Sequence, residues 1–245
     1  MQPRRPYVIS IAGHDPSGGA GLLADIKTFE AHKTLGLGVC TSITYQNDSE
    51  FDGMKWLELD DIIQQLDSLF RKYTCKVVKI GIIKDFSTLN TLVLHLKKTN
   101  PSVFIIWDPI VRSSSGFTFQ ALNETNILVE ITKNIDLITP NMVEFQQLFE
   151  NVSFDLKANT NILLKGGHNS GEEKNDVLYF GNKEFVFKGS SFNGLTKHGT
   201  GCVLSAAIAS NIAKGIELPK ACELAKEYIH RFILSNHSLL GYHIE

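Results

Sequence analysis

Short apolar runs alternate with longer amphipathic stretches along most of the chain. The run Tyr7 to Ala12 is typical of a buried strand, and β-branched runs recur at 38–45, 75–83, 102–110 and 135–140. Residues with helical spacing of their apolar positions fill the intervals, which predicts helices at 22–35, 59–73, 85–98, 122–132 and 141–150. This alternation predicts an α/β fold with a mostly parallel central sheet and helices on both faces.

The pattern changes from residue 161 onward. Three short runs, "NILLKG", "DVLYF" and "EFVFKG", are separated by turn-rich sequence and predict an antiparallel extension at the edge of the sheet. Helices are then expected at 201–214 and 219–239, and Pro219 suits the first turn of the second. Since no internal repeat, low-complexity tract or linker interrupts the sequence, we expect a single domain over residues 1–245.

Composition and charge exclude several classes of function. Hydrophobic residues make up 43% of the chain and charged residues 20%, as in ordinary globular proteins. A net charge of -2 provides no basic field for nucleic acid or anionic lipid, so we expect neither partner. The amino terminus lacks the secretory-signal pattern, and no apolar stretch approaches the ~20 residues that cross a bilayer. The 4 cysteines form no CxxC pair, which favours a reduced, cytoplasmic setting.

Polar and glycine-rich clusters follow the predicted strands. In open α/β sheets, ligands bind beyond the carboxyl ends of the strands. We therefore expect the clusters to meet at one edge of the sheet and to form a binding site there. In chain order they are "GHDPSGGAG", "QND", "GIIKD", "DPIVRSSSG", "TPNMVE" and "KGGHNSG".

Two of these clusters suit a small heterocycle. The first loop, which contains Gly13 and Gly18, fits neither the phosphate loop nor the dinucleotide GxGxxG pattern, and a tight turn or a backbone-lined pocket is left. Asp25, one turn into the following helix, is either a solvated charge or points back at that pocket. Gln46 offers an amide donor and acceptor that match an aminopyrimidine edge, although a turn after a strand also explains it.

Three further positions offer groups for phosphate and for a cation. Asn141 and Glu144 have the spacing of a capping box, and the same oxygens can also hold a hydrated Mg²⁺. Asp108 follows four apolar residues, where a carboxylate needs a partner such as a metal or a substrate. Lys165, beside a Gly-Gly pair, is either a phosphate-binding cation or an exposed lysine in a turn.

The sharpest cluster is "HGTGC", which opens a helix rich in alanine and serine. Gly199, Thr200 and Gly201 bring unpaired N–H groups and the positive end of a helix together, and these form an anion site. In that field we expect the pKa of the Cys202 thiol to be lowered, which makes it a candidate for proton exchange with a substrate. The alternative is a buried cysteine early in a helix.

These motifs, taken together and in order, closely resemble the hydroxymethylpyrimidine and phosphomethylpyrimidine kinases of thiamine biosynthesis, in the ribokinase-like superfamily. The resemblance rests on "IAGHDPSGGAGLLADIKTF", "TYQND", "KIGII", "WDPI", "TPNMVE", "LLKGGH" and "HGTGCVLSAAIA". It implies a three-layer α/β/α fold with no separate lid domain. It also implies transfer of the ATP γ-phosphoryl group to 4-amino-5-hydroxymethyl-2-methylpyrimidine and then to its monophosphate, with Mg²⁺, in a cytoplasmic homodimer.

The resemblance assigns substrate roles to five residues. Gln46 is expected to hydrogen-bond the amino and ring-nitrogen edge of the pyrimidine. Gly13 and Asp25 are expected to border the ring, and Ile82 and Ile110 to supply apolar walls.

The resemblance also assigns the phosphoryl-transfer residues. Gly199, Thr200, Gly201 and Cys202 form the anion hole under the transferred group, and Cys202 stands where sugar kinases of the superfamily carry a catalytic aspartate. The remaining expected residues are Asn141, Lys165 and Thr200 for ATP, and Glu144, together with Asp108, for the metal.

The chain departs from the family pattern at three positions. Leu23 stands where the family usually has Gln, Ile82 where members often have Met, and Arg112 lies where many have Lys. These differences bear on the second phosphorylation more than on the first.

Three other functions stay open. The pyridoxal kinases related to this family carry a further cysteine in the loop after the Asp-Pro strand, and "PIVRSSSGFTF" has none. A non-catalytic pyrimidine or nucleotide sensor would have lost the anion hole or the acid/base position, and both are intact. Acyl transfer by a cysteine nucleophile needs a histidine base; His198 is near in sequence, but the sequence indicates no third orienting residue.

Overall fold

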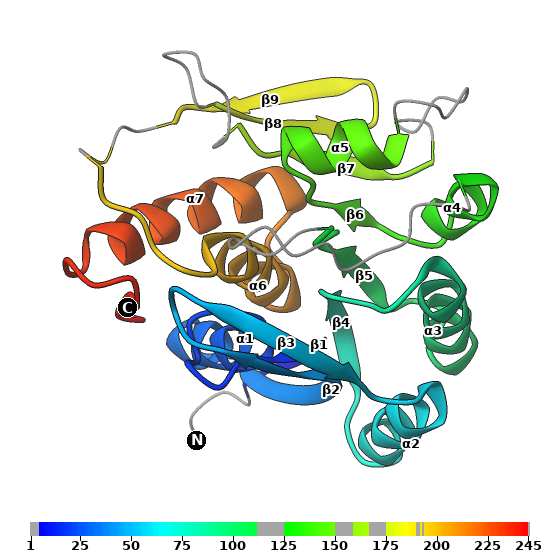
Figure 1. Cartoon of the computed structure of the whole chain (residues 1–245). Helices are drawn as coiled ribbons and strands as arrows, with labels where there is room; N and C mark the ends of the chain where they lie inside the picture. Colours follow the sequence, from blue (N-terminus) through cyan, green and yellow to red (C-terminus); the bar gives the residue numbers. More distant parts are fainter. Residues whose placement is uncertain are drawn as a thin grey trace.

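The computed structural model describes residues 5–111, 125–149, 159–166, 175–189, 192 and 194–244. The strands of these residues form one sheet in the order β3-β2-β1-β4-β5-β6-β7-β8-β9. Figure 1 shows this sheet running through the molecule between two layers of helices. The strands are β1 Tyr7–His14, β2 Leu35–Gln46, β3 Phe51–Trp56, β4 Cys75–Ile80, β5 Phe104–Trp107, β6 Leu137–Ile138, β7 Asn161–Leu164, β8 Asp176–Phe180 and β9 Lys183–Phe187.

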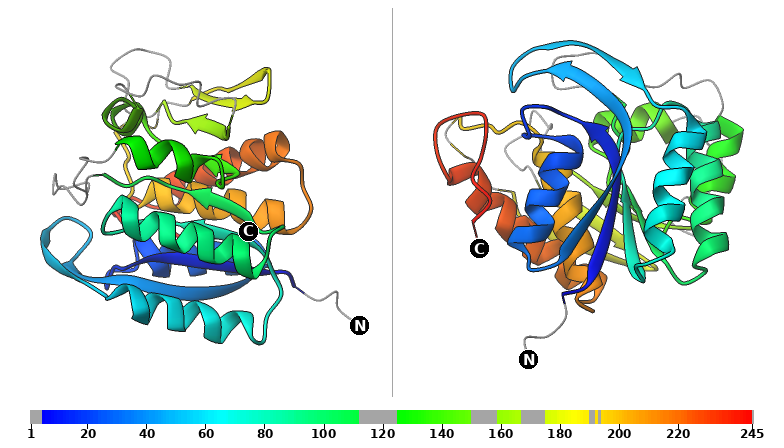
Figure 2. Two further views of the ribbon diagram at one scale, coloured as in Figure 1. Left: turned by 90° about the vertical axis from the view of Figure 1, so that its right-hand side faces the viewer. Right: turned by 90° about the horizontal axis from the view of Figure 1, so that it is seen from below.

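Helices cover both faces of the sheet, as Figures 1 and 2 show. One apolar core joins the sheet to α2, α3, α4 and α5, and a second core joins it to α1, α6 and α7. The three-layer α/β/α arrangement expected from the sequence is therefore confirmed. The helices are α1 Gly21–Ala31, α2 Leu59–Phe70, α3 Phe86–Thr99, α4 Thr125–Thr132, α5 Met142–Phe149, α6 Thr200–Ala213 and α7 Leu218–Leu234.

Helix α6 differs from the other helices because it is buried on nearly all sides. It packs against α1, α7, β1 and β4, and its buried positions run almost without a break from Cys202 to Ala213. Small side chains let a helix approach its neighbours closely, which explains the alanine- and serine-rich sequence. The start of α6 is thus held rigidly from several directions.

The parallel part of the sheet agrees with the prediction. β1 pairs in parallel with β2 and β4, and parallel pairing continues through β5, β6 and β7. Pro219 lies in the first turn of α7, as expected.

Among the described residues, no helix is long and apolar enough to cross a membrane. The assignment of residues 1–245 to one domain stays a prediction.

Several details differ from the sequence prediction. α1 ends at Ala31, four residues before the predicted end at 35, and Leu35 begins β2. β3 was not predicted; it pairs antiparallel with β2 and extends the sheet at that edge. The strand β7 pairs in parallel with β6, so that only β8 and β9 form the expected antiparallel extension. α7 ends at Leu234, five residues before the predicted end at 239, because Ser235 begins a non-helical segment that folds back. The predicted helix positions 122–124 and 150 lie outside the described residues.

Candidate active site

A cavity of about 650 Å³ lies at the carboxyl ends of the parallel strands. This is the edge at which open α/β sheets bind ligands, and the volume is in the usual range for ligand pockets. Almost all of the predicted site residues meet there. Those that line the cavity are Gly13, Gln46, Ile82, Asp108, Ile110, Asn141, Glu144, Lys165, Gly199, Thr200, Gly201 and Cys202.

The start of α6 packs backbone to backbone against the first loop. Gly199 caps α6 with φ 75°, and a Cβ there would lie 2.0 Å from the Gly19 carbonyl oxygen. Gly21, at the start of α1, has φ 58°, and a Cβ there would lie 2.3 Å from the Gly13 carbonyl oxygen. Both positions therefore require glycine, for their backbone conformation and for the close approach.

Cys202 lies in the first turn of α6 and is 5% exposed. The expected lowering of its thiol pKa is wrong: burial raises the pKa to about 11, although Lys79 and the backbone amide of Gly21 favour the thiolate. Loss of hydration outweighs the favourable charges around the sulfur. Cys202 is therefore a protonated thiol near neutral pH.

Asp108 forms an ion pair with Lys165 at the cavity wall. Its Oδ1 accepts hydrogen bonds from Lys165 Nζ at 2.9 Å and from the Thr139 hydroxyl at 2.8 Å. Its Oδ2 accepts a hydrogen bond from the Ser205 hydroxyl at 3.1 Å. Burial alone would raise the pKa of Asp108, but Lys165 and Lys79 hold it below its ordinary value. Asp108 is therefore an ionised carboxylate that anchors Lys165.

The capping box predicted at the start of α5 is confirmed. Asn141 Oδ1 accepts the Glu144 N–H at 2.9 Å, and Glu144 Oε2 accepts the Asn141 N–H at 2.7 Å. A parallel β-bridge places Asn141 beside Lys165, whose Nζ lies 4.0 Å from Glu144 Oε2. Burial raises the pKa of Glu144 to about 7, and the charge of Lys165 opposes that rise. The capping role and the lining of the cavity coexist at these two residues.

The donor set fits a hydrated magnesium ion and does not fit a closed metal cage. In the part of the chain that the structure describes, no group of three or more His, Cys, Asp and Glu side chains could hold a metal. Both oxygens of Asp108 already accept hydrogen bonds, whereas one oxygen of Glu144 serves the helix cap. Mg²⁺ keeps several waters and binds through one or two carboxylates together with substrate phosphates. This chemistry favours Glu144 over Asp108 as the carboxylate nearest such an ion.

The structure does not support contact between Asp25 and a ligand. Asp25 is fully buried and does not line the cavity. Its carboxylate pairs with Lys79 Nζ at 2.7 Å and accepts the Ser10 hydroxyl at 2.5 Å. The sequence alternatives, a solvated charge or a side chain that faces the pocket, did not include a sealed ion pair.

Two pairs of interacting side chains in the cavity wall were missed by the sequence reasoning. His198 Nε2 contacts Asp15 Oδ2 at 2.9 Å, and Lys226 contacts Asp176. All four residues line the cavity. Asp15 lies inside the glycine-rich loop "GHDPSGGAG". A carboxylate in that loop was therefore visible in the sequence as a candidate site residue. Nothing local marks Lys226, which is one of several charged residues on α7.

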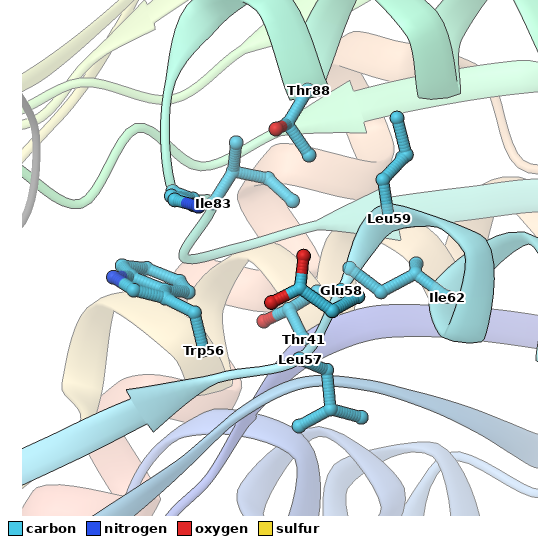
Figure 3. A pocket seen from close by; sticks show the side chains of 9 residues that line it. Thr41, Trp56, Leu57, Glu58, Leu59, Ile62, Ile83 and Thr88 are labelled. Carbon is cyan, nitrogen blue, oxygen red and sulfur yellow. The ribbon is translucent and has the colours of Figure 1, made fainter.

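A second cavity, shown in Figure 3, lies between the middle of β2, the end of β3 and the starts of α2 and α3. Its volume is about 70 Å³, and its walls include Trp56, Ile62 and Ile83. A space of this size holds a few water molecules and excludes a substrate. The larger cavity is therefore the candidate active site.

Comparison with known proteins identifies the family. The model of the phosphomethylpyrimidine kinase family matches residues 15–244. The chain belongs to that family. The resemblance expected from the sequence motifs is thus confirmed, and the chain is a phosphotransferase of the ribokinase-like fold.

Two members of the phosphomethylpyrimidine kinase family match this chain along almost their whole length. A hydroxymethylpyrimidine/phosphomethylpyrimidine kinase of Aquifex aeolicus (strain VF5) is 36% identical over 96% of this chain and 98% of the relative. The crystal structure of a phosphomethylpyrimidine kinase from Clostridium difficile 630 has a TM-score of 0.78 at 31% identity, and covers 93% of this chain and 99% of the other. A Bacillus subtilis pyridoxal kinase, solved as an ADP complex, has a TM-score of 0.78 at 25% identity, over 94% and 92% of the two chains.

Proposed function

We propose that the protein transfers the γ-phosphoryl group of ATP to the hydroxymethyl oxygen of 4-amino-5-hydroxymethyl-2-methylpyrimidine, and then phosphorylates the monophosphate to the diphosphate. The observation that carries the proposal is the place of Cys202. Cys202, in the first turn of α6, lines the same cavity as Gln46 and Lys165, so the thiol shares one space with a group suited to an aminopyrimidine and a group suited to phosphate. Membership of the phosphomethylpyrimidine kinase family supports this reaction.

The pyrimidine end of the cavity is formed by Gln46, Gly13, Ile82 and Ile110. The Gln46 amide has the donor and acceptor that the amino group and ring nitrogen require. At Gly13 a Cβ would lie 2.6 Å from Ser42 Oγ and 2.9 Å from Ile82 Cγ2, so glycine lets the end of β1 pack closely against Ile82 in this wall. Ile82 and Ile110 provide the apolar contacts on which such a ring packs.

The phosphate end is formed by Lys165, Thr200 and the backbone of the first turn of α6. Phosphoryl transfer asks a protein chiefly for positioning and charge neutralisation. Asp108 holds Lys165 at the cavity wall, and the N–H groups after Gly199 point out of the start of α6. Glu144, with Asn141 at the same turn, would hold the water shell of a bound Mg²⁺, and that ion would supply charge neutralisation for the phosphates of ATP.

Cys202 serves chiefly to orient the attacking hydroxyl. With its pKa raised to about 11 by burial, the thiol is protonated at neutral pH and is not a resting base. In a loose transition state the attacking oxygen forms little bond, so early removal of its proton contributes little. A sulfur atom that fixes the direction of the alcohol is then the larger contribution.

The second candidate is phosphorylation of pyridoxal or pyridoxine. The Bacillus subtilis pyridoxal kinase shares the fold at 25% identity, which supports this alternative. The 4 cysteines of this chain are Cys40, Cys75, Cys202 and Cys222, so the loop after β5 contributes none. That absence favours the pyrimidine. The position of Arg112 in this loop lies outside the described residues.

Product analysis by mass tests the proposal. The protein is incubated with ATP, Mg²⁺ and the aminopyrimidine, and in parallel with pyridoxal. We expect one and then two added phosphates on the pyrimidine. Faster turnover of pyridoxal would assign the second candidate, and pyrimidine binding without ADP formation would assign a sensor. Sedimentation of the same preparation tests the expected homodimer.

A further inference from the structure

The first loop, residues 15–20, and the segment before α6, residues 195–199, form one tight joint. A Cβ on Gly19 would lie 2.6 Å from His198 Cδ2, just as a Cβ on Gly199 would meet the Gly19 carbonyl oxygen. The two segments are about 180 residues apart in sequence, yet no side chain fits between their backbones. Their relative position therefore depends on the few groups that join them.

One carboxylate fastens this joint. Asp15 Oδ2 contacts His198 Nε2 at 2.9 Å, and the two side chains are 1% and 11% exposed. The same carboxylate accepts the Ser17 N–H and the Ala20 N–H, each at 2.9 Å. Because an ionised carboxylate only accepts hydrogen bonds, His198 Nε2 donates. Asp15 therefore ties both ends of its own loop and the segment before α6 to one point.

The far side of the segment before α6 is fastened as well. The His198 backbone N–H donates to the Leu239 carbonyl at 2.9 Å. Lys197 Nζ donates to the carbonyls of Asn236 at 2.6 Å and Ser238 at 2.7 Å. The segment is thus anchored to the carboxyl-terminal residues, and the first loop is held on this anchored surface by His198.

The joint determines what surrounds Cys202. Gly21 follows Ala20 directly, and its backbone amide is one of the groups that favour the Cys202 thiolate. Gly199 begins the turn that carries Cys202. A shift of the loop relative to α6 would therefore move the Gly21 amide away from the sulfur and would open the anion hole. Displacements of about 1 Å at a reacting centre reduce rates by roughly 100-fold.

We propose that Asp15 and His198 are positioning residues for phosphoryl transfer: their pairing holds the first loop on the first turn of α6, and so aligns the Gly21 amide, the anion hole and Cys202. This inference rests on the proposed function, since it concerns the same site. It assigns no contact with the substrate to either residue.

Three substitutions test it through the separation of kcat from KM. His198→Leu removes the donor, and we expect kcat to fall roughly 10- to 100-fold with little change in the KM for the pyrimidine. His198→Gln retains an N–H donor near the Nε2 position, and we expect it to restore most of kcat. Asp15→Asn replaces one acceptor by a donor that faces other donors, so kcat should fall as in His198→Leu. The double variant Asp15→Asn/His198→Leu should lose little more than either single variant.

The protein contains a matched control. His95 Nε2 contacts Asp67 Oδ1 at 2.8 Å in a pair that joins α3 to α2, on the opposite face of the sheet from α6. His95→Leu removes the same kind of pair and should leave kcat unchanged. If His198→Leu does not fold, the contrast between His198→Gln and Asp15→Asn carries the test. Equal kcat in these two variants, or in His198→Leu and wild type, would overturn the inference.

Amide hydrogen exchange separates this inference from the proposed function. In His198→Leu we expect faster exchange in residues 16–21 and 199–203, and no change in α3. A wild-type protein that does not phosphorylate the pyrimidine would refute the proposed function, while exchange would still report on the joint. A protein that is active, but whose loop exchanges at the wild-type rate in His198→Leu, would refute the joint alone.

Discussion

Two buried aspartate–lysine pairs lie close to Cys202 and differ in their access to the cavity. Asp108 and Lys165 meet at 2.9 Å, and the lysine side chain is 14% exposed in the cavity wall. Asp25 and Lys79 meet at 2.7 Å, and both side chains are 0% exposed. The same two residue types therefore form one pair that reaches the cavity wall and one that is sealed.

The two pairs therefore differ in what they can act on: the open pair faces the cavity, and the sealed pair faces only other parts of the protein. Lys165 keeps its charge beside Asp108, with a pKa raised to about 12 although burial opposes the charge, and its side chain lines the cavity. In the sealed pair, burial raises the pKa of Asp25 although Lys79 opposes that rise. Lys79 is also the main charge that favours the Cys202 thiolate. The sealed pair thus acts on the site through the protein interior. Burial opposes the charged state of all four residues, so both pairs carry a desolvation cost.

Removal of the Cys202 thiol, which lies close to both pairs, should have the largest effect on kcat. Cys202→Ala should reduce kcat by about 10²- to 10⁴-fold, because the attacking hydroxyl is no longer held in its reacting direction. The KM for the pyrimidine should change little, since Gln46 and the apolar walls stay in place. Steady-state kinetics measures both. The control is Cys222→Ala on α7, outside the cavity lining, and equal kcat in the two variants would contradict the role.

Breaking the sealed pair should reduce the stability of the fold more than breaking the open pair does. Lys79→Met leaves the Asp25 carboxyl buried without its partner and should reduce the free energy of unfolding by about 3–5 kcal/mol. Urea denaturation measures the loss. The double variant Lys79→Met/Asp25→Leu removes both charges and should recover much of it. A double variant less stable than the single one would show that the pair does not act as a unit.

Breaking the open pair should damage catalysis instead. Lys165→Met should reduce kcat/KM for ATP by about 10²- to 10³-fold, as expected for removal of a charge that stabilises the transferred group. Its loss of stability should be smaller than that of Lys79→Met, because the Asp108 carboxylate keeps its bonds from Thr139 and Ser205. Kinetics and urea denaturation of the same preparation check both. Lys79→Met and Lys165→Met with equal losses of stability would remove the distinction between the pairs.

Two half-buried histidines, His32 and His243, should have the smallest effect near neutral pH, because they act on stability only as the pH falls. Burial lowers the pKa of His32 and of His243 to about 4, and the nearby cations Lys214, Arg231 and Lys27 act in the same direction. Between pH about 6.5 and 4 the unfolded chain binds these protons and the folded chain does not, so stability decreases as pH falls.

The measurement is urea denaturation as a function of pH. The two groups together account for a slope of up to about two protons in this window, and stability should not depend on them above pH about 7. His32→Gln should reduce the slope by about half. A wild-type slope unchanged in that variant would show that His32 is not a source of the pH dependence.

The parallel part of the fold was predictable because its signals are local. Apolar strands alternate with amphipathic helices, and each helix places its apolar stripe on the sheet. β3 was missed because Phe51–Trp56 contains Asp52 and Gly53 and has weak strand propensity; it forms because β2 offers a long edge for pairing. The direction of β7 likewise depends on its neighbour β6 and not on its own residues.

The candidate site was predictable as a set of positions and not as a set of contacts. The clusters at strand ends and the glycines before Cys202 were visible in sequence because sheet topology brings strand ends together. The Lys79 partner of Asp25 and the Asp15 partner of His198 join segments far apart in the chain, and no local pattern encodes such a pairing.

The sequence by itself determined the alternation of elements, the glycines that the two close backbone contacts require, and membership of the phosphomethylpyrimidine kinase family. Only the tertiary structure decided which charges are sealed and which line the cavity, and that the Cys202 pKa is raised instead of lowered. The reason is that a propensity or a helix end acts over a few residues, whereas the hydration of a charged group depends on every segment packed around it.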